Sequence, residues 1–400
     1  MSAVVPHRRG LWLIFFLNGA VLSSWAPRIP AVKDSLALSD FELGLALWGV
    51  AVGSVPTLLL TGRLLRRVAA RTLCRASALV FAAGLPLIAG AWNLITLALA
   101  LVLLGTASGM LDVAMNAAAV GLERAWQVTV LPGLHGGYSL GVLSGAGMGT
   151  VAAGSLPVAE HFVLVAAVLL GVLALAWSRL PAAGPDMGQL ASPAGGRRRR
   201  WRPPWALVVF ALCALLTEGL VTDWSAVLLQ QELGTSATVA GLGVTIFSAA
   251  MALSRTVGNR LITIATPARV ARWGTAVVTG ALLAGLLQPH PLVLLGALAL
   301  VGLGCGPLFP LAISTAARRS TVPVGSVTAS LTAWGYLAYL GGPPVAGAVA
   351  AYIGLPATLL LLGGMAAATM LLVSFVAVSW TPHHITSHLD SPSAISEKEN

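Results

Sequence analysis

Long apolar stretches dominate the chain, and each is bounded by a short polar or basic segment. Most are near the length of about 20 residues that a helix needs to cross a bilayer. Lipid offers backbone groups no hydrogen-bond partners, so spans in such number are expected to be helices. The expected spans cover about 11–31, 41–61, 73–92, 95–122, 129–153, 158–180, 205–229, 237–254, 270–287, 291–316, 325–349 and 353–380.

These spans read as two copies of one six-span block, displaced by 197 or 198 residues. The matching positions are Leu43-Gly44 with Ala240-Gly241, Gly105 and Gly109 with Gly302 and Gly306, and Gly137-Tyr138 with Gly335-Tyr336. A parallel repeat of six helices is typical of secondary transporters, which bind solutes between the repeats near the bilayer midplane. The pattern therefore predicts an all-α membrane protein of 12 transmembrane helices in two pseudo-symmetric six-helix bundles.

The division into domains follows from the same pattern. Residues 1–180 and 205–380 are the two bundles, and 381–400 is a polar tail expected to be disordered and cytoplasmic. Residues 181–204 are rich in Pro, Gly and Arg and predict a cytoplasmic linker. Its arginine run at 197–200 is expected to contact the anionic lipids of the inner leaflet.

Composition excludes several classes of protein. The chain is 57% hydrophobic and only 9% charged, too few charges to cover a water-facing surface. The net charge is +10, and the lysines and arginines lie in alternate connecting segments, which we take to be cytoplasmic. Only Arg28 and Lys33 fall on the other side of the membrane. This bias predicts that both termini are cytoplasmic and argues against nucleic-acid binding.

The sequence contains no nucleotide-binding loop and no cluster with metal-ligand spacing. Its one G-x-S-x-G string, at 137–141, lies inside an expected membrane span and not at the strand-to-helix turn that this motif needs for catalysis. Cys74, Cys213 and Cys305 lie in or beside spans and are expected to be small apolar residues. We therefore expect no catalytic residues, no metal and no cofactor, an ion gradient as energy source, and a monomer.

Two acidic positions within the spans are candidates for proton coupling. Asp112 and Asn116 lie one helical turn apart, so one face can bind hydroxyl groups or hold a proton. Glu218 lies near the middle of its span, where a charge is costly and proton uptake is favoured. Structural polar contacts between helices are the alternative for both sites.

Further candidates line the expected interface between the bundles. Arg28 and Asp223 occupy equivalent spans and are expected to form an external gate, although Arg28 could instead pair with Asp34 or a lipid phosphate. The remaining candidates for substrate binding are Asn18, Trp25, His135, Tyr138, Trp224, Trp334 and Tyr336. Aromatic rings suit the apolar face of a sugar, but tryptophan is also common at membrane interfaces.

The chain resembles the major facilitator superfamily over about residues 10–380. Its loop after the second span reads GRLLRRVAAR from Gly62, with Arg66 where that family has Asp. Within the family it is similar to the branch of the fucose–proton symporter and its bacterial relatives. The matching segments are FFLNGAVLSSWAPRIP, DVAMN, LPGLHGGYSLG and EGLVTDWSAVLL. The acid that this symporter carries in its first span has no counterpart here, where Ala26 stands.

The resemblance implies a multi-pass permease of the bacterial cytoplasmic membrane. We expect a small polar, sugar-like solute, alternating access and proton coupling through Asp112 and Glu218. Two alternatives stay open: an exporter of drugs or metabolites with the same fold, and a membrane sensor that does not transport.

Overall fold

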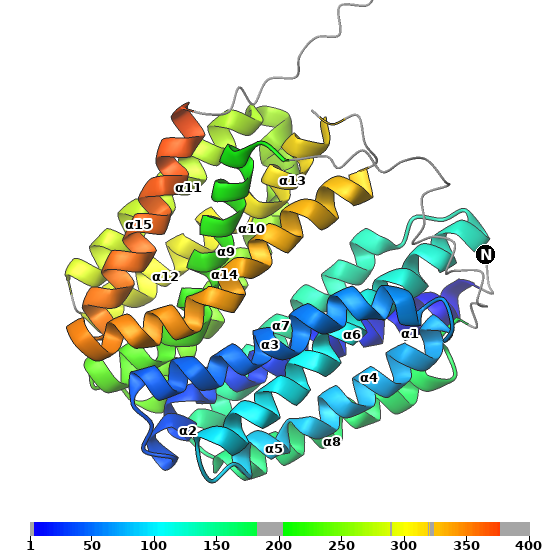
Figure 1. The fold of residues 1–400 in the computed structure, drawn as a ribbon, viewed down its shortest axis with the longest axis horizontal. Coiled ribbons are helices and arrows are strands. Elements are labelled where there is room, and N and C mark those ends of the chain that lie inside the picture. Colours follow the sequence, from blue (N-terminus) through cyan, green and yellow to red (C-terminus); the bar gives the residue numbers. More distant parts are fainter. Residues whose placement is uncertain (1–3, 182–202, 289, 319, 321–323, 377–400) are drawn as a thin grey trace, which may run out of the picture.

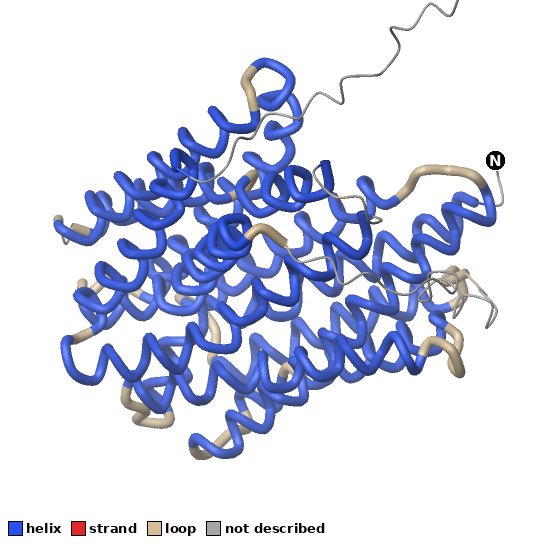
Figure 2. Tube along the Cα trace, turned by 45° about the horizontal axis from the view of Figure 1, so that its top comes forward, coloured by secondary structure: helices blue, strands red, loops and turns tan. Residues whose placement is uncertain are grey.

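A computed structural model describes residues 4–181, 203–288, 290–318, 320 and 324–376. The described part consists of helices joined by short connections and contains no strand (Figures 1 and 2). The expected linker at 181–204 falls almost wholly outside these residues, and so does the expected tail at 381–400.

The first half is formed by α1 (Val4–Trp25), η1 (Ala26–Arg28), α2 (Ile29–Ser35), α3 (Asp40–Leu64), α4 (Ala70–Gly84), α5 (Pro86–Ala89), α6 (Leu94–Trp126), α7 (Leu131–Ala153) and α8 (Val158–Trp177). The second half is formed by α9 (Trp205–Val227), η3 (Leu228–Glu232), α10 (Ala237–Ile264), α11 (Pro267–Leu287), α12 (Pro291–Cys305), α13 (Leu308–Arg318), α14 (Val324–Ile353) and α15 (Leu355–Val376). Several spans are broken into consecutive short helices, and Pro27, Pro86 and Pro307 each lie at such a break. Proline removes a backbone donor and so interrupts a helix locally.

Ten stretches of the described residues are long and apolar enough to cross a membrane. The two remaining spans of the predicted twelve are α7 and α14, which are both rich in glycine. Glycine contributes little apolar surface but permits close helix contact, and this is how both helices are used. The fold is thus an all-α membrane bundle of twelve spans.

The two halves repeat the same packing. The second span packs against the fourth in each half, as α3 on α6 and as α10 on α12. Gly105 lies against the backbone of Val50, and its repeat partner Gly302 lies against the backbone of Phe247. The glycine repeat of the sequence therefore marks equivalent points of close helix approach.

The halves meet along two symmetric contacts, α3 with α14 and α7 with α10, which we call the inter-half seam. Gly44 lies against the Pro343 carbonyl and Gly347, and Gly241 lies against Thr150 and Pro27. The hydroxyls of Thr150 and Thr245 are 2.8 Å apart across the same seam.

These contacts lie near one end of the bundle, which we call the Lys33 end. The opposite end carries the loop between α3 and α4 and is called the arginine-rich end. Figure 1 shows the blue α3 and the orange α14 meeting at lower left, while the two halves diverge toward upper right. The seam is therefore closed at the Lys33 end.

Candidate functional site

Asp112 and Asn116 lie near the middle of α6 and share one face, as their spacing predicts. The Asn116 side-chain amide donates to the Asp112 carbonyl at 2.8 Å and to its carboxylate oxygen Oδ1 at 3.3 Å. Both side chains are half-buried. Among the described residues no cation forms an ion pair with Asp112, so its carboxylate is free to meet a solute or a proton.

Glu218 on α9 has a cationic partner that was not expected. The Arg255 Nη2 atom lies 3.4 Å from both carboxylate oxygens of Glu218. The two side chains are 36% and 22% exposed, for Arg255 and Glu218 respectively. Glu218 therefore has a partner on a neighbouring helix in this conformation.

The reason is the length of α10. The apolar pattern predicts the end of this span at about residue 254 and places Arg255 in a cytoplasmic connection, whereas α10 continues to Ile264. Arg255 consequently projects from within a helix that packs against α9. The apolar positions that continue beyond Arg255 at Val257, Leu261 and Ile262 are the signal that could have revealed the longer helix.

Aromatic and polar side chains from both halves surround these groups. Tyr138 on α7 is close enough to interact electrostatically with Asp112, Glu218 and Arg255. Tyr339 on α14 interacts in the same way with Glu218 and Arg255. The resulting central cluster consists of Asp112, Asn116, His135, Tyr138, Glu218, Arg255, Tyr336 and Tyr339.

The second-half tyrosines and His135 complete this cluster. The Tyr336 and Tyr339 rings are 6.2 Å apart on α14, and Tyr336 is within electrostatic range of Asp112 across the interface. The His135 ring packs edge-on against Phe15 at 5.2 Å and lies within range of Arg255. Tyr339 was not among the expected residues, although it follows Tyr336 by about one turn.

The expected tryptophans lie elsewhere. Trp224 is 0% exposed and Trp25 is 3% exposed, the latter packed on Phe162 at a ring distance of 6.2 Å. Neither ring is accessible to a solute in this conformation, so the expectation that they stack on one is not met here. Trp334 on α14 is 47% exposed. Asn18 is buried on α1, and its side-chain oxygen has no hydrogen-bond partner within the described ranges.

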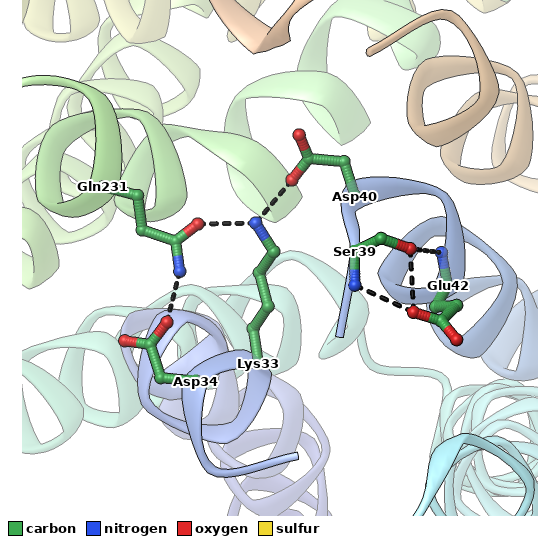
Figure 3. Close-up of polar contacts among 6 residues, drawn as sticks. All are labelled: Lys33, Asp34, Ser39, Asp40, Glu42 and Gln231. Atoms are coloured by element: carbon green, nitrogen blue, oxygen red, sulfur yellow. Dashed lines mark hydrogen bonds and ion pairs between the residues drawn. The ribbon is translucent and has the colours of Figure 1, made fainter. Parts of the chain in front are cut away.

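A polar network closes the Lys33 end across both halves (Figure 3). The Lys33 ammonium lies 2.5 Å from the Asp40 carboxylate and donates to the Gln231 side-chain oxygen at 2.5 Å. The Gln231 amide in turn donates to Asp34 at 2.5 Å. We call Lys33, Asp34, Asp40 and Gln231 the Lys33 network.

Local structure fixes the position of Asp40 in this network. Ser39 caps α3 by accepting from the Glu42 backbone N–H at 3.3 Å, and Glu42 accepts from the Ser39 backbone N–H at 2.9 Å. This capping box sets where α3 begins. Asp40 is consequently the first residue of the helix, beside Lys33.

The expected pair of Arg28 and Asp223 is not formed in this conformation. Arg28 is 3% exposed and its Nη2 donates to the Leu156 carbonyl at 2.8 Å, within its own half. Asp223 is half-buried on α9 and forms no ion pair in the described part of the chain. Asp34, the other expected partner of Arg28, is bound by Gln231 instead.

Comparison with known proteins agrees with this architecture. The model of the Major Facilitator Superfamily matches residues 206–391. An uncharacterised MFS-type transporter of Yersinia pestis is 31% identical over 84% of this chain and 87% of its own length. An uncharacterised transporter of Sinorhizobium fredii is 33% identical over 88% of this chain and 93% of its own length. The membrane protein MosC of Rhizobium meliloti is 32% identical over 86% of this chain and 84% of its own length.

Solved structures with the same fold are more distant in sequence. The nucleoside transporter NupG superposes with a TM-score of 0.73 at 12% identity, covering 93% of this chain and 98% of its own. A bacterial homologue of the human lysosomal transporter Spinster, in an inward-facing conformation, superposes with a TM-score of 0.74 at 14% identity. The match covers 93% of this chain and 97% of that protein. The duplicated bundle, the seam between its halves and the relatives at full length place the chain in the major facilitator superfamily, as a membrane transporter and not an enzyme.

Proposed function

We propose that this transporter carries a small polar, sugar-like solute across the bacterial cytoplasmic membrane by proton-coupled alternating access. The central cluster is the observation that carries the proposal, because it brings carboxylate, amide, phenol and guanidinium groups from both halves together. A solute held by both halves couples its own binding to their relative movement. The transporter would work as a monomer within the membrane lipids.

The cluster suits a hydroxylated solute. Asp112 and Asn116 offer acceptors and donors on one face of α6, and Tyr138 and Tyr336 add phenolic hydroxyls from α7 and α14. Groups of this kind discriminate by hydrogen bonding, since a solute without matching hydroxyls leaves them unpaired. Asn18, His135 and Trp334 remain candidate contacts, and Trp25 and Trp224 would need a different conformation.

Two acids are available for coupling, and their surroundings differ. Asp112 accepts from the amide of Asn116 and forms no ion pair among the described residues, whereas Glu218 is held at 3.4 Å by Arg255. Protonation of Glu218 would release Arg255, and deprotonation would draw it back. A change of partner of this kind can link proton binding to helix movement because the two side chains lie on different helices, α9 and α10.

The closed Lys33 end supports an assignment of state. If the arginine-rich end faces the cytoplasm, as the distribution of basic residues predicts, the conformation is inward-facing. The Lys33 network would then be the external gate that must open to admit solute from outside. Arg28 and Asp223 would form a further gating pair in another conformation.

Uptake into proteoliposomes tests this proposal. Labelled sugars, polyols and, because one structural neighbour transports nucleosides, nucleosides are offered with and without an inward proton gradient. We expect accumulation of one class against its gradient, lost in Asp112→Asn and in Glu218→Gln. Both variants should still exchange solute across the membrane without net accumulation.

A double variant separates coupling from simple charge balance. If Glu218 serves only as counter-ion of Arg255, then Glu218→Gln combined with Arg255→Gln restores uphill uptake. If Glu218 carries the proton, uphill uptake stays lost. Absence of flux for every hydroxylated solute would overturn the sugar-like assignment. Efflux of apolar drugs by the same vesicles would favour the exporter, and ligand binding without flux in either direction would favour the sensor.

A further inference from the structure

Arg28, at the Lys33 end, is a buried cation that has no counter-charge among the residues that the structure describes. Arg28 ends the short helix η1 and is 3% exposed. One nitrogen, Nη2, donates to the Leu156 carbonyl, while Nε and Nη1 are buried and have no hydrogen-bond partner among the described residues. A buried guanidinium usually has a carboxylate partner, because an isolated charge is costly to remove from water.

A second unsatisfied side chain lies beside it. His161, one turn into α8, is also 3% exposed, and neither ring nitrogen has a hydrogen-bond partner in the described part of the chain. It lies close enough to Arg28 for their charges to interact. The two residues therefore present four buried nitrogens without partners: Nε and Nη1 of Arg28, and Nδ1 and Nε2 of His161. Such groups are uncommon in native interiors, and each needs an explanation.

The acids of this end do not supply the missing charge. Asp40 pairs with Lys33, and Asp34 accepts from Gln231. Glu160 is exposed, and Asp223 is half-buried. Neither forms an ion pair among the described residues. The Leu156 carbonyl satisfies one donor but carries no net charge to balance the guanidinium.

We propose that Arg28 and His161 form a binding site for a small monovalent anion of the chloride class. The anion would accept from Arg28 Nε and Nη1 and from one N–H of the His161 ring. The burial of both side chains excludes a phospholipid headgroup, whose bulk could not reach donors enclosed on every side. This site lies in the first half alone and is separate from the central cluster.

The position of η1 connects this site to the seam. Pro27, which precedes Arg28, lies against Gly149 of α7 and Gly241 of α10. It therefore stands between the halves where they touch. An anion that neutralises Arg28 would hold η1 in this place and stabilise the closed Lys33 end, since a ligand stabilises the state it binds.

Thermal unfolding of the purified protein tests the site. Chloride is titrated against gluconate at constant ionic strength, because gluconate is too large to reach side chains that are only 3% exposed. We expect a saturable rise in Tm for wild type and none for Arg28→Gln. Arg28→Lys, which keeps the charge with fewer donors, and His161→Asn should both move the midpoint to higher chloride. They also provide a readout if Arg28→Gln fails to fold.

Lys33→Met is the matched control, since it removes another buried cation of the same segment whose charge is already balanced by Asp40. It should keep the chloride-dependent rise. An anomalous bromide peak between Arg28 and His161 in bromide-soaked crystals would locate the anion. A flat titration of wild type would mean that these nitrogens meet only water, and an equal rise in Arg28→Gln would place any anion elsewhere. Either result overturns the proposal.

Discussion

The two ends of the molecule are held together in different ways. At the Lys33 end, contacts cross between the halves: the Lys33 network, the Thr150–Thr245 hydrogen bond and the backbone approach of α3 to α14. At the arginine-rich end, polar groups bind within their own half. Arg75 donates to the Trp177 carbonyl, and His7 lies 2.9 Å from the Arg179 carbonyl, both in the first half.

This difference shows how one sequence can hold two bundles rigid and still let them move. These contacts at the arginine-rich end lie within one half, so separation of the halves there breaks none of them. At the other end closure depends on small residues and on hydrogen bonds that water could replace. Motion is therefore expected at the seam, where water can replace the contacts that are lost on opening, and not within a half.

The fraction of molecules open at the Lys33 end can be followed by a thiol placed in the seam. Thr238 lies directly against Gly154 across the halves, so the maleimide labelling rate of Thr238→Cys reports opening. The three native cysteines are buried and should give a low background, which is measured in the chain without the added thiol. The following predictions use this reporter.

The largest effect is expected for Gly44→Leu. A Cβ atom at Gly44 would come within 2.6 Å of the Pro343 carbonyl oxygen and 3.1 Å of the Gly347 Cα. Overpacking of this kind costs about 1–3 kcal/mol, so labelling should rise and uptake should fall by about fivefold to about a hundredfold. Gly62→Leu is the control on the same helix, where nothing lies within 4 Å. Equal behaviour of the two variants would contradict the closed seam.

A smaller effect is expected for Gln231→Leu, which removes both hydrogen bonds of the Lys33 network that cross the halves. Lys33 and Asp40 remain paired. Because Gln231 is exposed, the loss should be about 1.5 kcal/mol, or a labelling increase of about tenfold at most. Gln230→Leu, at the neighbouring position without these bonds, should label like wild type. A wild-type rate in Gln231→Leu would show that the network does not act as a gate.

A modest effect is expected for Thr150→Val, which removes the hydroxyl that meets Thr245. Hydrogen bonds between membrane helices contribute about 0.6 kcal/mol, so labelling should rise about threefold. Thr150→Ser keeps the hydroxyl and should restore the wild-type rate. If Thr150→Ser labels as fast as Thr150→Val, the lost methyl and not the hydrogen bond is responsible.

The smallest effect is expected at the arginine-rich end. Arg75→Gln removes a guanidinium that lies 4.7 Å from the centre of the Trp177 ring and donates to the Trp177 carbonyl. Both groups belong to the first half, so labelling in the distant seam should stay within about twofold of wild type. The variant should lower Tm instead, because α4 and α8 lose a contact. Faster labelling would mean that the two ends are coupled through a single half.

Several features could be predicted from the chain because they depend on local spacing. The apolar stretches predicted the membrane bundle, and equal offsets between glycines predicted the repeat, which the structure confirms as matching close approaches at Gly105 and Gly302. The spacing of Asp112 and Asn116 placed them on one face of α6, where their side chains meet. Helical periodicity determines such relations without reference to any other helix.

Partners on different helices were decided by tertiary structure alone. Arg255 and Glu218 are 37 residues apart in the sequence, and Lys33 and Gln231 are 198 residues apart, yet each pair is in contact. Arg28 donates to the Leu156 carbonyl and does not meet Asp223. Hydropathy indicates that a helix is buried in lipid or protein, but it does not say which face meets which neighbour. Small residues set how closely and at what rotation two helices approach, and that geometry decides which charges come within reach of one another.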